Sequence, residues 1–314
     1  MDIEYLLLLQ KFREATNEIL TPFFEDLSMF AVAWLFVIPA FIYWCTDKKA
    51  GLYVLFSFYM SIAINAVVKL TACIYRPWIR DARVVPAGDA ITTATGYSFP
   101  SGHTSTAVPI YGGLALTNGK KHKITAAVCV ILALLTMFSR NYLGVHTPQD
   151  VLTGCLVGCL SLTAASKIFA YLEIHPEKEN AFLIAGFVLG WLALLYISVK
   201  PYPMDYFGGE LLVDPKKMMK DGFGDIGAFI AFCAARFTEK KYVDFKNTGL
   251  DAKGVVTGVI GILIVQLFRK YGGPWLDEVL GIHWGHFVSN FVVVFYIVAG
   301  FPAVIKMIYS KKVR

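Results

Sequence analysis

The sequence predicts an all-α fold, a polytopic bundle of about eight or nine transmembrane helices. Hydrophobic residues make up 56% of the chain and charged residues only 17%, with a mean hydropathy of +0.57, whereas soluble domains usually carry about 25% charged residues. Several apolar segments reach or approach the ~20 residues that a helix needs to cross a bilayer. Because no low-complexity tract, Pro/Ser-rich linker or fixed-period repeat divides the chain, we expect one polytopic domain.

The predicted spans follow one another along the chain, and the shorter ones have the least defined boundaries. They cover residues 28–46, 52–74, 104–118, 124–140, 150–172, 182–199, 223–236, 254–268 and 286–308. Before them, residues 1–27 mix leucines and phenylalanines with charges, and they begin with acids and lack the cleavage pattern of a secretory signal. We predict an interfacial N-terminal helix in the headgroup layer there; a cytosolic cap on the bundle is the alternative.

The positive charges predict the orientation of the spans. They concentrate in connections that the span order places on one side: Lys48–Lys49, Lys120–Lys121 with Lys123, Lys240–Lys241 with Lys246 and Lys253, and Lys311–Lys312 with Arg314. The positive-inside rule makes this side cytoplasmic. The opposite face then receives the N-terminus and the motifs described next, although Lys216, Lys217 and Lys220 weaken the bias.

Two classes of function are not expected. The net charge of +6 is spread along the chain without a basic stripe interleaved with aromatics, so nucleic-acid binding is not predicted. The six cysteines lie in or at the ends of apolar spans and none has CxxC spacing. Neither a disulfide framework nor a zinc site is therefore indicated.

Charged side chains at membrane depth cost roughly 2.5–3.5 kcal/mol each, so they are candidates for function. The first cluster is KLTACIYRPW, in which Lys69 and Arg76 are two helical turns apart on one face. Pro77 disfavours helical geometry at the residue before it, so the helix should end near Arg76. Two cations at a helix end predict an anion site; snorkelling to lipid headgroups is the alternative.

The second cluster is GYSFPSGHTSTAVPIYGG. Pro100 and Ser101 begin a span, and Gly102 and His103 lie in its first turn. The unpaired N–H groups of a helix N-terminus form a phosphate cradle, and Gly102 has no side chain to block an approaching anion. Ser101 can cap the helix or donate to an oxygen. An ordinary capped helix with an incidental histidine is the alternative.

The third cluster is SRNYLGVHTPQD. Arg140 can donate to two phosphate oxygens at once. Thr147 and Pro148 are typical of the start of a helix, and Asp150 could simply complete a capping box. Alternatively, Asp150 keeps one imidazole nitrogen of His146 protonated, which frees the other as a base or nucleophile.

The two histidines and the aspartate could instead bind a metal. However, Lys69, Arg76 and Arg140 would repel a divalent cation and attract a phosphoryl group, whose charge spreads over its equatorial oxygens. The residues therefore favour phosphoryl chemistry with no metal and no cofactor.

The three stretches resemble the signature of the type-2 phosphatidate phosphatase superfamily, K-x6-R-P, P-S-G-H and S-R-x5-H-x3-D. Every defining position is matched, in order and at the family spacing: Lys69 with Arg76–Pro77, Pro100–Ser101–Gly102–His103, and Ser139–Arg140 with His146 and Asp150. The match covers roughly residues 50–170. We therefore predict a catalytic transmembrane core at 28–175 and additional C-terminal transmembrane helices packing on it at 176–314.

The resemblance implies a role for each site residue. His146 would attack phosphorus and form a phosphohistidine, Asp150 would orient it, and His103 would protonate the leaving oxygen. The phosphoryl oxygens would be held by Lys69, Arg76, Ser101, Gly102 and Arg140. In membrane members of this family the site opens on the non-cytoplasmic face, which agrees with the charge count.

The predicted function is that of an integral membrane phosphatase acting on a lipid phosphomonoester or an isoprenoid or lipid diphosphate. Membrane lipids and an amphiphilic phosphate are the expected partners. One alternative is a lipid phosphotransferase using the same site; another is a non-catalytic binder or transporter of anionic lipid. Outside the motifs, residues 200–225 are read as a long outer connection, either a lid or a surface loop, and His283 and His286 as part of an interfacial belt.

Overall fold

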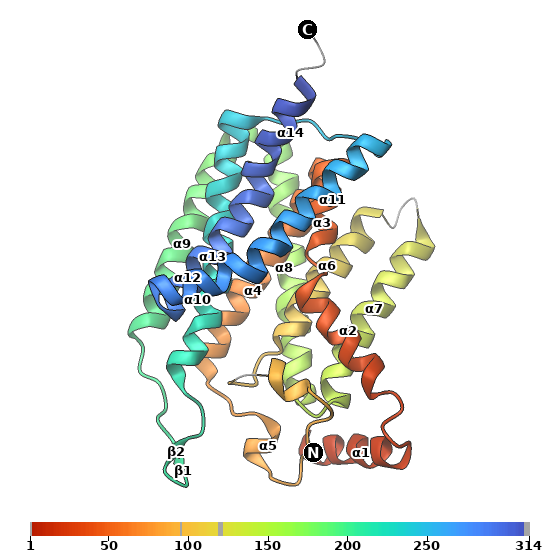
Figure 1. The fold of residues 1–314 in the computed structure, drawn as a ribbon, viewed down its shortest axis with the longest axis vertical. Coiled ribbons are helices and arrows are strands. Elements are labelled where there is room, and N and C mark those ends of the chain that lie inside the picture. The colour runs from red at the N-terminus through yellow and green to blue at the C-terminus, as the bar shows by residue number, and fades with distance from the viewer. Residues whose placement is uncertain (1, 95, 119–121, 311–314) are drawn as a thin grey trace.

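The described residues of the chain, 2–94, 96–118 and 122–310 of a computed structural model, form a bundle of long helices with one short hairpin at its end (Figure 1). The first eight helices are α1 (Asp2–Ala15), α2 (Thr21–Ala33), α3 (Val37–Cys45), α4 (Lys48–Ala72), α5 (Pro77–Arg80), α6 (Gly102–Asn118), α7 (Lys123–Tyr142) and α8 (Pro148–Ile174). They are followed by α9 (Glu179–Val199), the strands β1 (Tyr206–Phe207) and β2 (Glu210–Leu211), α10 (Pro215–Thr238), α11 (Ala252–Leu267), α12 (Gly273–Leu280), α13 (Ile282–Phe295) and α14 (Phe301–Ser310). Short 3-10 turns occupy Ala90–Thr93 and Pro176–Lys178, and π turns occupy Glu239–Val243, Phe268–Gly272 and Tyr296–Gly300.

The all-α prediction is confirmed, but the predicted count of eight or nine spans is wrong. Within the described ranges, six helical segments are long and apolar enough to cross a membrane, or seven if α2 and α3, bent by 48° against each other, form one span. Two predicted spans fall short for physical reasons: α6 has only 17 residues, and α10 carries Asp221, Asp225 and Arg236 among its apolar residues. Both pack against α4 inside the bundle.

Helix α4 is the centre of the bundle. Asp47 caps its N-terminus by accepting hydrogen bonds from the backbone N–H groups of Lys49 and Ala50, and the helix ends at Cys73, which has a left-handed φ of 49°. In its most apolar window 67% of the residues are buried, compared with 22–28% for the spans of α7, α8, α9 and α11. Because α6, α8 and α10 all pack against α4, its faces meet other helices rather than lipid.

Helix α1 lies across the end of the bundle (Figure 1). It is fixed there by Arg13, which is buried and donates to the backbone oxygens of Tyr142 and Val85, both at 2.8 Å. The backbone oxygen of Tyr142 belongs to the last turn of α7, two residues after Arg140. The interfacial position of residues 1–27 remains a prediction, and the structure adds that α2 already begins at Thr21.

The segment predicted as an outer connection, 200–225, is partly ordered. Tyr206 pairs with Leu211 in an antiparallel hairpin whose two turn residues, Gly208 and Gly209, have φ values of 60° and 86°, as a two-residue turn requires. Helix α10 begins at Pro215, behind the capping Asp214, well before the predicted start at 223. Residues 215–225 are therefore a helical wall rather than a loop.

Of the basic residues used to predict orientation, Lys120, Lys121, Lys311, Lys312 and Arg314 lie outside the described residues. The three motif clusters share one end of the bundle (Figure 1). The C-terminal end of α4, the N-terminal ends of α6 and α8 and the C-terminal end of α7 all meet there.

Candidate active site

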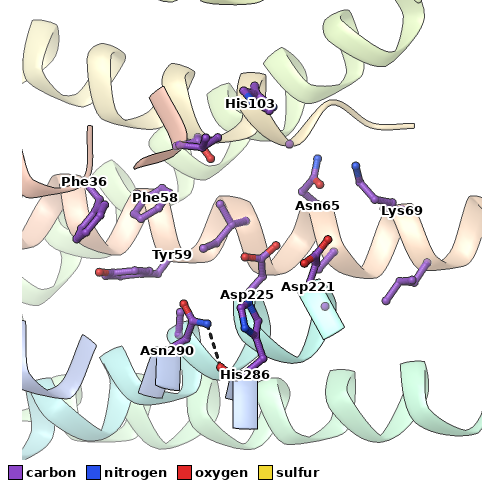
Figure 2. A pocket seen from close by; sticks show the side chains of 18 of the residues that line it. Phe36, Phe58, Tyr59, Asn65, Lys69, His103, Asp221, Asp225, His286 and Asn290 are labelled. Carbon is purple, nitrogen blue, oxygen red and sulfur yellow. Dashed lines mark hydrogen bonds between the residues drawn. The ribbon is translucent and has the colours of Figure 1, made fainter. Parts of the chain in front are cut away.

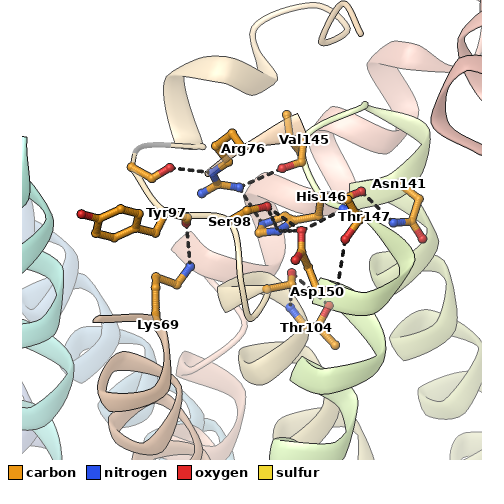
Figure 3. Close-up of polar contacts among 12 residues, drawn as sticks. Lys69, Arg76, Tyr97, Ser98, Thr104, Asn141, Val145, His146, Thr147 and Asp150 are labelled. Atoms are coloured by element: carbon orange, nitrogen blue, oxygen red, sulfur yellow. Dashed lines mark hydrogen bonds and ion pairs between the residues drawn. The ribbon is translucent and has the colours of Figure 1, made fainter. Parts of the chain in front are cut away.

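Lys69 and Arg76 of the first cluster lie close to His146 and Asp150 of the third cluster (Figure 3). A cavity of about 430 Å³ is lined by Lys69 and Arg76 of the first cluster, Gly102 and His103 of the second, and His146 of the third. Residues far apart in the sequence thus surround a space large enough for a small ligand, since ligand pockets usually measure about 300–1,000 Å³.

His146 is held rigidly in the turn between α7 and α8. Its backbone N–H donates to the Arg140 oxygen at 3.2 Å, and its backbone oxygen accepts from the Asn141 amide at 2.8 Å. The preceding Gly144 has a φ of +73°, which a glycine adopts without strain. Only 1% of His146 is exposed, so the imidazole has little freedom to reorient.

The neighbours of His146 determine which of its ring nitrogens carries the proton. Its Nε2 lies 2.9 Å from Nη1 of Arg76. A guanidinium can only donate hydrogen bonds, so Nε2 is the acceptor and keeps its lone pair. The proton of the neutral ring then lies on Nδ1, which faces Oδ2 of Asp150 at 3.3 Å. The arrangement presents an unprotonated Nε2 as a nucleophile.

Burial, and after it the positive charge of Arg76, hold the pKa of His146 well below its usual range. The imidazole is therefore neutral near pH 7. A neutral ring is what nucleophilic attack requires, because a protonated Nε2 has no lone pair to give.

Asp150 both caps α8 and contacts His146, so the two interpretations of this residue describe one arrangement. Its Oδ2 accepts from the backbone N–H of Thr147 at 2.8 Å, while the Thr147 hydroxyl accepts from the Asp150 N–H at 3.4 Å. This capping box fixes the same oxygen that faces Nδ1 of His146. Capping supplies the rigidity with which the carboxylate orients the ring.

Ser98 is a site residue that the sequence interpretation missed. Its side chain is fully buried, its hydroxyl donates to Oδ2 of Asp150 at 2.5 Å, and it lies 3.4 Å from Nδ1 of His146. A possible signal was present, because Ser98 stands two residues before Pro100 at the start of the second motif. Its hydroxyl is positioned to orient the carboxylate.

The N-terminus of α6 was predicted to form a phosphate cradle, and it borders the cavity at Gly102 and His103. The Ser101 hydroxyl, fully buried, accepts from the backbone N–H and the hydroxyl of Thr104 at 3.4 and 3.1 Å, which makes it a helix cap. A Cβ added at Gly102 would have no atom within 4 Å, and Gly102 lines the cavity. An anion can therefore reach the backbone N–H groups of the first turn.

His103 contributes a second imidazole to the cavity. It is 7% exposed, and within the described chain its Nε2 has no hydrogen-bond partner. A buried ring nitrogen without a partner is costly, and a ligand oxygen in the cavity would supply the missing bond.

Of the three predicted cations, Lys69 and Arg76 line the cavity, whereas Arg140 is buried outside its lining. Lys69 reaches the backbone oxygen of Tyr97 at 3.5 Å, and Arg76 donates to the backbone oxygens of Val145 and Gly96 at 2.9 and 3.1 Å. Arg140 is 1% exposed and donates to the Ser28 hydroxyl. In the part of the chain that is described, its Nε and Nη2 have no partner, so a fork of guanidinium N–H groups is available to an anion.

Across residues 2–94, 96–118 and 122–310, no group of three or more histidine, cysteine, aspartate and glutamate side chains could hold a metal ion.

The C-terminal helices add residues that the sequence did not point to. Asp221 and Asp225 of α10 and His286 and Asn290 of α13 line the same cavity. Both histidines were predicted to belong to an interfacial belt, but His286 lines the cavity. Its neighbour His283 instead lies 2.7 Å from the Lys216 backbone oxygen and stacks on Phe223. Only the packing of α10 and α13 reveals which of the two histidines faces the cavity.

Comparison with known proteins gives one family. A model of the PAP2 superfamily matches residues 50–174. The chain is 32% identical over 125 residues to the undecaprenyl-diphosphatase of Sulfolobus acidocaldarius, covering 40% of this chain and 58% of that protein. It is 31% identical over 152 residues to phosphatidylglycerophosphatase B of Bacillus subtilis, covering 46% and 70%. It is 26% identical over 216 residues to lipid phosphate phosphatase delta of Arabidopsis thaliana, covering 62% and 48%.

The matches to the first and third of these proteins span less than two thirds of their length. No solved structure matches the chain significantly.

Proposed function

Because the chain belongs to the PAP2 superfamily, we propose that it is a multi-pass membrane phosphatase that releases phosphate from an amphiphilic phosphate ester. One observation supports this proposal most: the unprotonated Nε2 of His146 lies 2.9 Å from Arg76 Nη1 in a cavity that also receives His103. The site combines a nucleophile, cations for the phosphoryl oxygens and a second imidazole for proton transfer.

In the first step, the Nε2 lone pair of His146 attacks phosphorus as the phosphoryl group takes the place between Nε2 and Arg76. An N–P bond forms and the bond from phosphorus to the ester oxygen breaks. Burial, and after it the charge of Arg140, hold the pKa of His103 well below its usual range. The negative charge of the bound phosphate ester opposes this shift, so His103 takes up a proton with the substrate and gives it to the departing oxygen, which leaves as an alcohol. The ring of His146 becomes cationic, and the carboxylate of Asp150, 3.3 Å from Nδ1, stabilises that charge.

In the second step, His103, now neutral, accepts a proton from water as the water oxygen attacks phosphorus. The N–P bond breaks, its electron pair returns to Nε2, and inorganic phosphate leaves. Throughout both steps Lys69, Arg76, Arg140 and the N–H groups at the start of α6 would hold the phosphoryl oxygens. Removing one such preorganised donor typically costs ~100- to 1,000-fold in rate.

An amphiphilic substrate fits the position of the site at one end of an apolar bundle. A lipid in the adjacent leaflet could present its phosphate there while its chains stay in the membrane. We further propose that this end faces the non-cytoplasmic side, since the lysine-rich connections of the described chain, such as Lys48–Lys49 and Lys240–Lys241, lie at the opposite end.

The test is phosphate release by detergent-purified protein from phosphatidate, an isoprenoid diphosphate, a sphingoid phosphate and a sugar phosphate. His146→Ala and His103→Ala should abolish release while the protein remains folded. His122→Ala is the matched control, because His122 is exposed and precedes α7 at the far end of the bundle. Full activity of His146→Ala would refute the mechanism, and strict dependence on added magnesium would contradict its metal independence.

The same assay separates hydrolysis from phosphoryl transfer. An added alcohol acceptor would become phosphorylated in place of free phosphate release if the enzyme were a phosphotransferase. Binding of phosphate lipid without any release would identify a non-catalytic binder.

A further inference from the structure

The cavity continues beyond the phosphoryl site, along α4 and between α10 and α13. Figure 2 shows His103 on one side and Asp221, Asp225 and His286 on the other, with Asn65 and Lys69 of α4 between them. Further along α4 the lining becomes mostly apolar, with Ile62, Tyr59 and Phe58, joined by Phe36 and Val293; the guanidinium of Arg269 also lines it and lies 4.8 Å from the centre of the Phe36 ring. From Lys69 to Tyr59 the helix rises by about 15 Å, so the cavity has a polar end and an apolar end.

The polar end has an acidic wall. Asp221 and Asp225 are one turn apart on α10, so their carboxylates lie on the same helix face. Asp225 is half-buried, and among the described residues it has no hydrogen-bond or ion-pair partner. Burial, and after it the nearby Asp221, raise the pKa of Asp225 to about 8, because Lys69 forms no ion pair with it in the described chain. A cationic ligand group beside Asp225 would favour its ionised form.

Close packing of α10 puts these acids in the cavity. A Cβ at Gly222 would lie 2.6 Å from the Leu70 side chain of α4, and one at Gly224 would lie 2.5 Å from the His286 ring of α13. The two glycines therefore let α10 approach both helices more closely than any other residue would allow. The position of the two acids in the cavity therefore depends on the close packing of α10 against α4 and α13.

A second, independent observation indicates that the cavity receives a ligand. His103, nine-tenths buried, lines the cavity with an unpartnered Nε2, and beside it Gly102 faces open space. A phosphoryl group at this end would be followed immediately by the alcohol part of the substrate, which then lies against Asp221 and Asp225.

We propose that Asp221 and Asp225 determine substrate specificity by binding an ammonium group on the alcohol part, close to the ester oxygen. They would accept hydrogen bonds from the ammonium and repel a second phosphate at that position. This inference rests on the proposed phosphatase activity and narrows it to amphiphilic phosphomonoesters that carry an amine. The apolar stretch past Asn65 would receive the beginning of the hydrocarbon chain.

Three synthetic substrates test the proposal: dodecyl phosphate, its analogue with an amino group on the second carbon, and dodecyl diphosphate. The readout is kcat/KM for each in mixed micelles. Wild-type protein should prefer the amino compound over dodecyl phosphate by between about tenfold and a hundredfold, the value of a hydrogen bond to a charged group. Dodecyl diphosphate should be the poorest of the three.

Asp225→Asn and, separately, Asp221→Asn should reduce the preference for the amino compound towards one and raise the relative rate on the diphosphate. These opposite changes distinguish specificity from a structural role, which would lower all three rates together. Asp225→Glu should restore part of the amine preference. Asp244→Asn is the matched control, because that carboxylate is 87% exposed at the opposite end of the bundle; it should leave all ratios as in wild type.

The outcomes separate the two proposals. No release of phosphate from any substrate would contradict the proposed function itself. Hydrolysis of dodecyl phosphate without an amine preference, or equal losses on all substrates in both asparagine variants, would overturn the specificity proposal alone. Two variants are used so that misfolding of one, detected by size-exclusion chromatography, leaves the test intact.

Discussion

Replacing Asp150 by asparagine separates the two tasks of this carboxylate. An asparagine oxygen can still accept the hydrogen bonds that Oδ2 now receives from the Thr147 N–H and from Nδ1 of His146, at 2.8 and 3.3 Å. The capping box therefore survives and only the negative charge is lost. Asp150→Ala removes both the charge and the cap.

The size of the effect follows from the distance. Two unit charges 3.3 Å apart interact by about 5 kcal/mol at an effective dielectric constant of about 20. The asparagine dipole keeps part of this, so we expect the barrier to phosphohistidine formation to rise by about 2.7–4 kcal/mol. This corresponds to a loss of roughly a hundredfold to a thousandfold in kcat.

The assay pairs initial rates of phosphate release with thermal unfolding in the same detergent. Asp150→Asn should lose rate at nearly unchanged melting temperature, whereas Asp150→Ala should also lose about 0.5–2 kcal/mol of stability with its cap. Asp251→Asn is the control, since Asp251 caps α11 through the Gly254 N–H at 2.9 Å, outside the site. If Asp150→Asn kept more than about a third of wild-type kcat, the carboxylate would be only a cap and the assigned role of His146 would be unsupported.

Three further predictions concern the cradle, the guanidinium and the acid side of the pH range. Gly102→Ala should lower kcat/KM at unchanged stability, because its Cβ meets no protein atom. Gly154→Ala should also destabilise the fold, since its Cβ would lie 2.8 Å from the Ser101 backbone oxygen. Thermal unfolding distinguishes the two variants, and an equal loss of stability would contradict the open space at Gly102. Inorganic phosphate should raise the melting temperature of wild-type protein by binding the folded state. Arg140→Gln loses the unpartnered Nε and Nη2 and should abolish this rise. If phosphate still raised the melting temperature of the variant, the anion would bind away from Arg140. Because the pKa of His146 is lowered in the folded state, the neutral ring contributes stability above its unfolded pKa of about 6.5, and this contribution is lost as pH falls towards the folded pKa. The melting temperature of His146→Gln should therefore fall less between about pH 7 and pH 5 than that of wild type. Parallel curves of melting temperature against pH would show that His146 does not cause this dependence.

The residues of the candidate site could be predicted from the sequence because each cluster lies where a helix begins or ends. Within each cluster, the spacing of the residues shows which side chains share a helix face or lie in its first turn. These clusters are Lys69 to Arg76, Pro100 to His103 and Arg140 to Asp150. What the sequence could not supply was how the clusters contact one another. The 2.9 Å contact between Arg76 and His146, which assigns the imidazole proton, joins residues 70 positions apart.

The other omissions have different causes. The count of spans was too high because α6 has only 17 residues and α10 carries Asp221, Asp225 and Arg236 among its apolar residues. The start of α10 was missed although Asp214–Pro215 is a typical helix-start pair, because the lysines that follow were read as an outer connection. With that start misplaced, Asp221 was assigned to a loop.

If both proposals hold, the two parts of the chain have different roles in the reaction. All the cations and both histidines proposed for catalysis lie in residues 69–146, inside the segment that matches the PAP2 superfamily, whereas Asp221, Asp225, His286 and Asn290 lie outside it. Every phosphate ester presents the same phosphoryl group, so the residues that hold it need not differ between enzymes acting on different lipids. The alcohol part is what differs, and in this structure it would meet α10 and α13. Selectivity should therefore change with substitutions in these two helices, while the rate of the chemical step should change with substitutions around α4, α6 and α8.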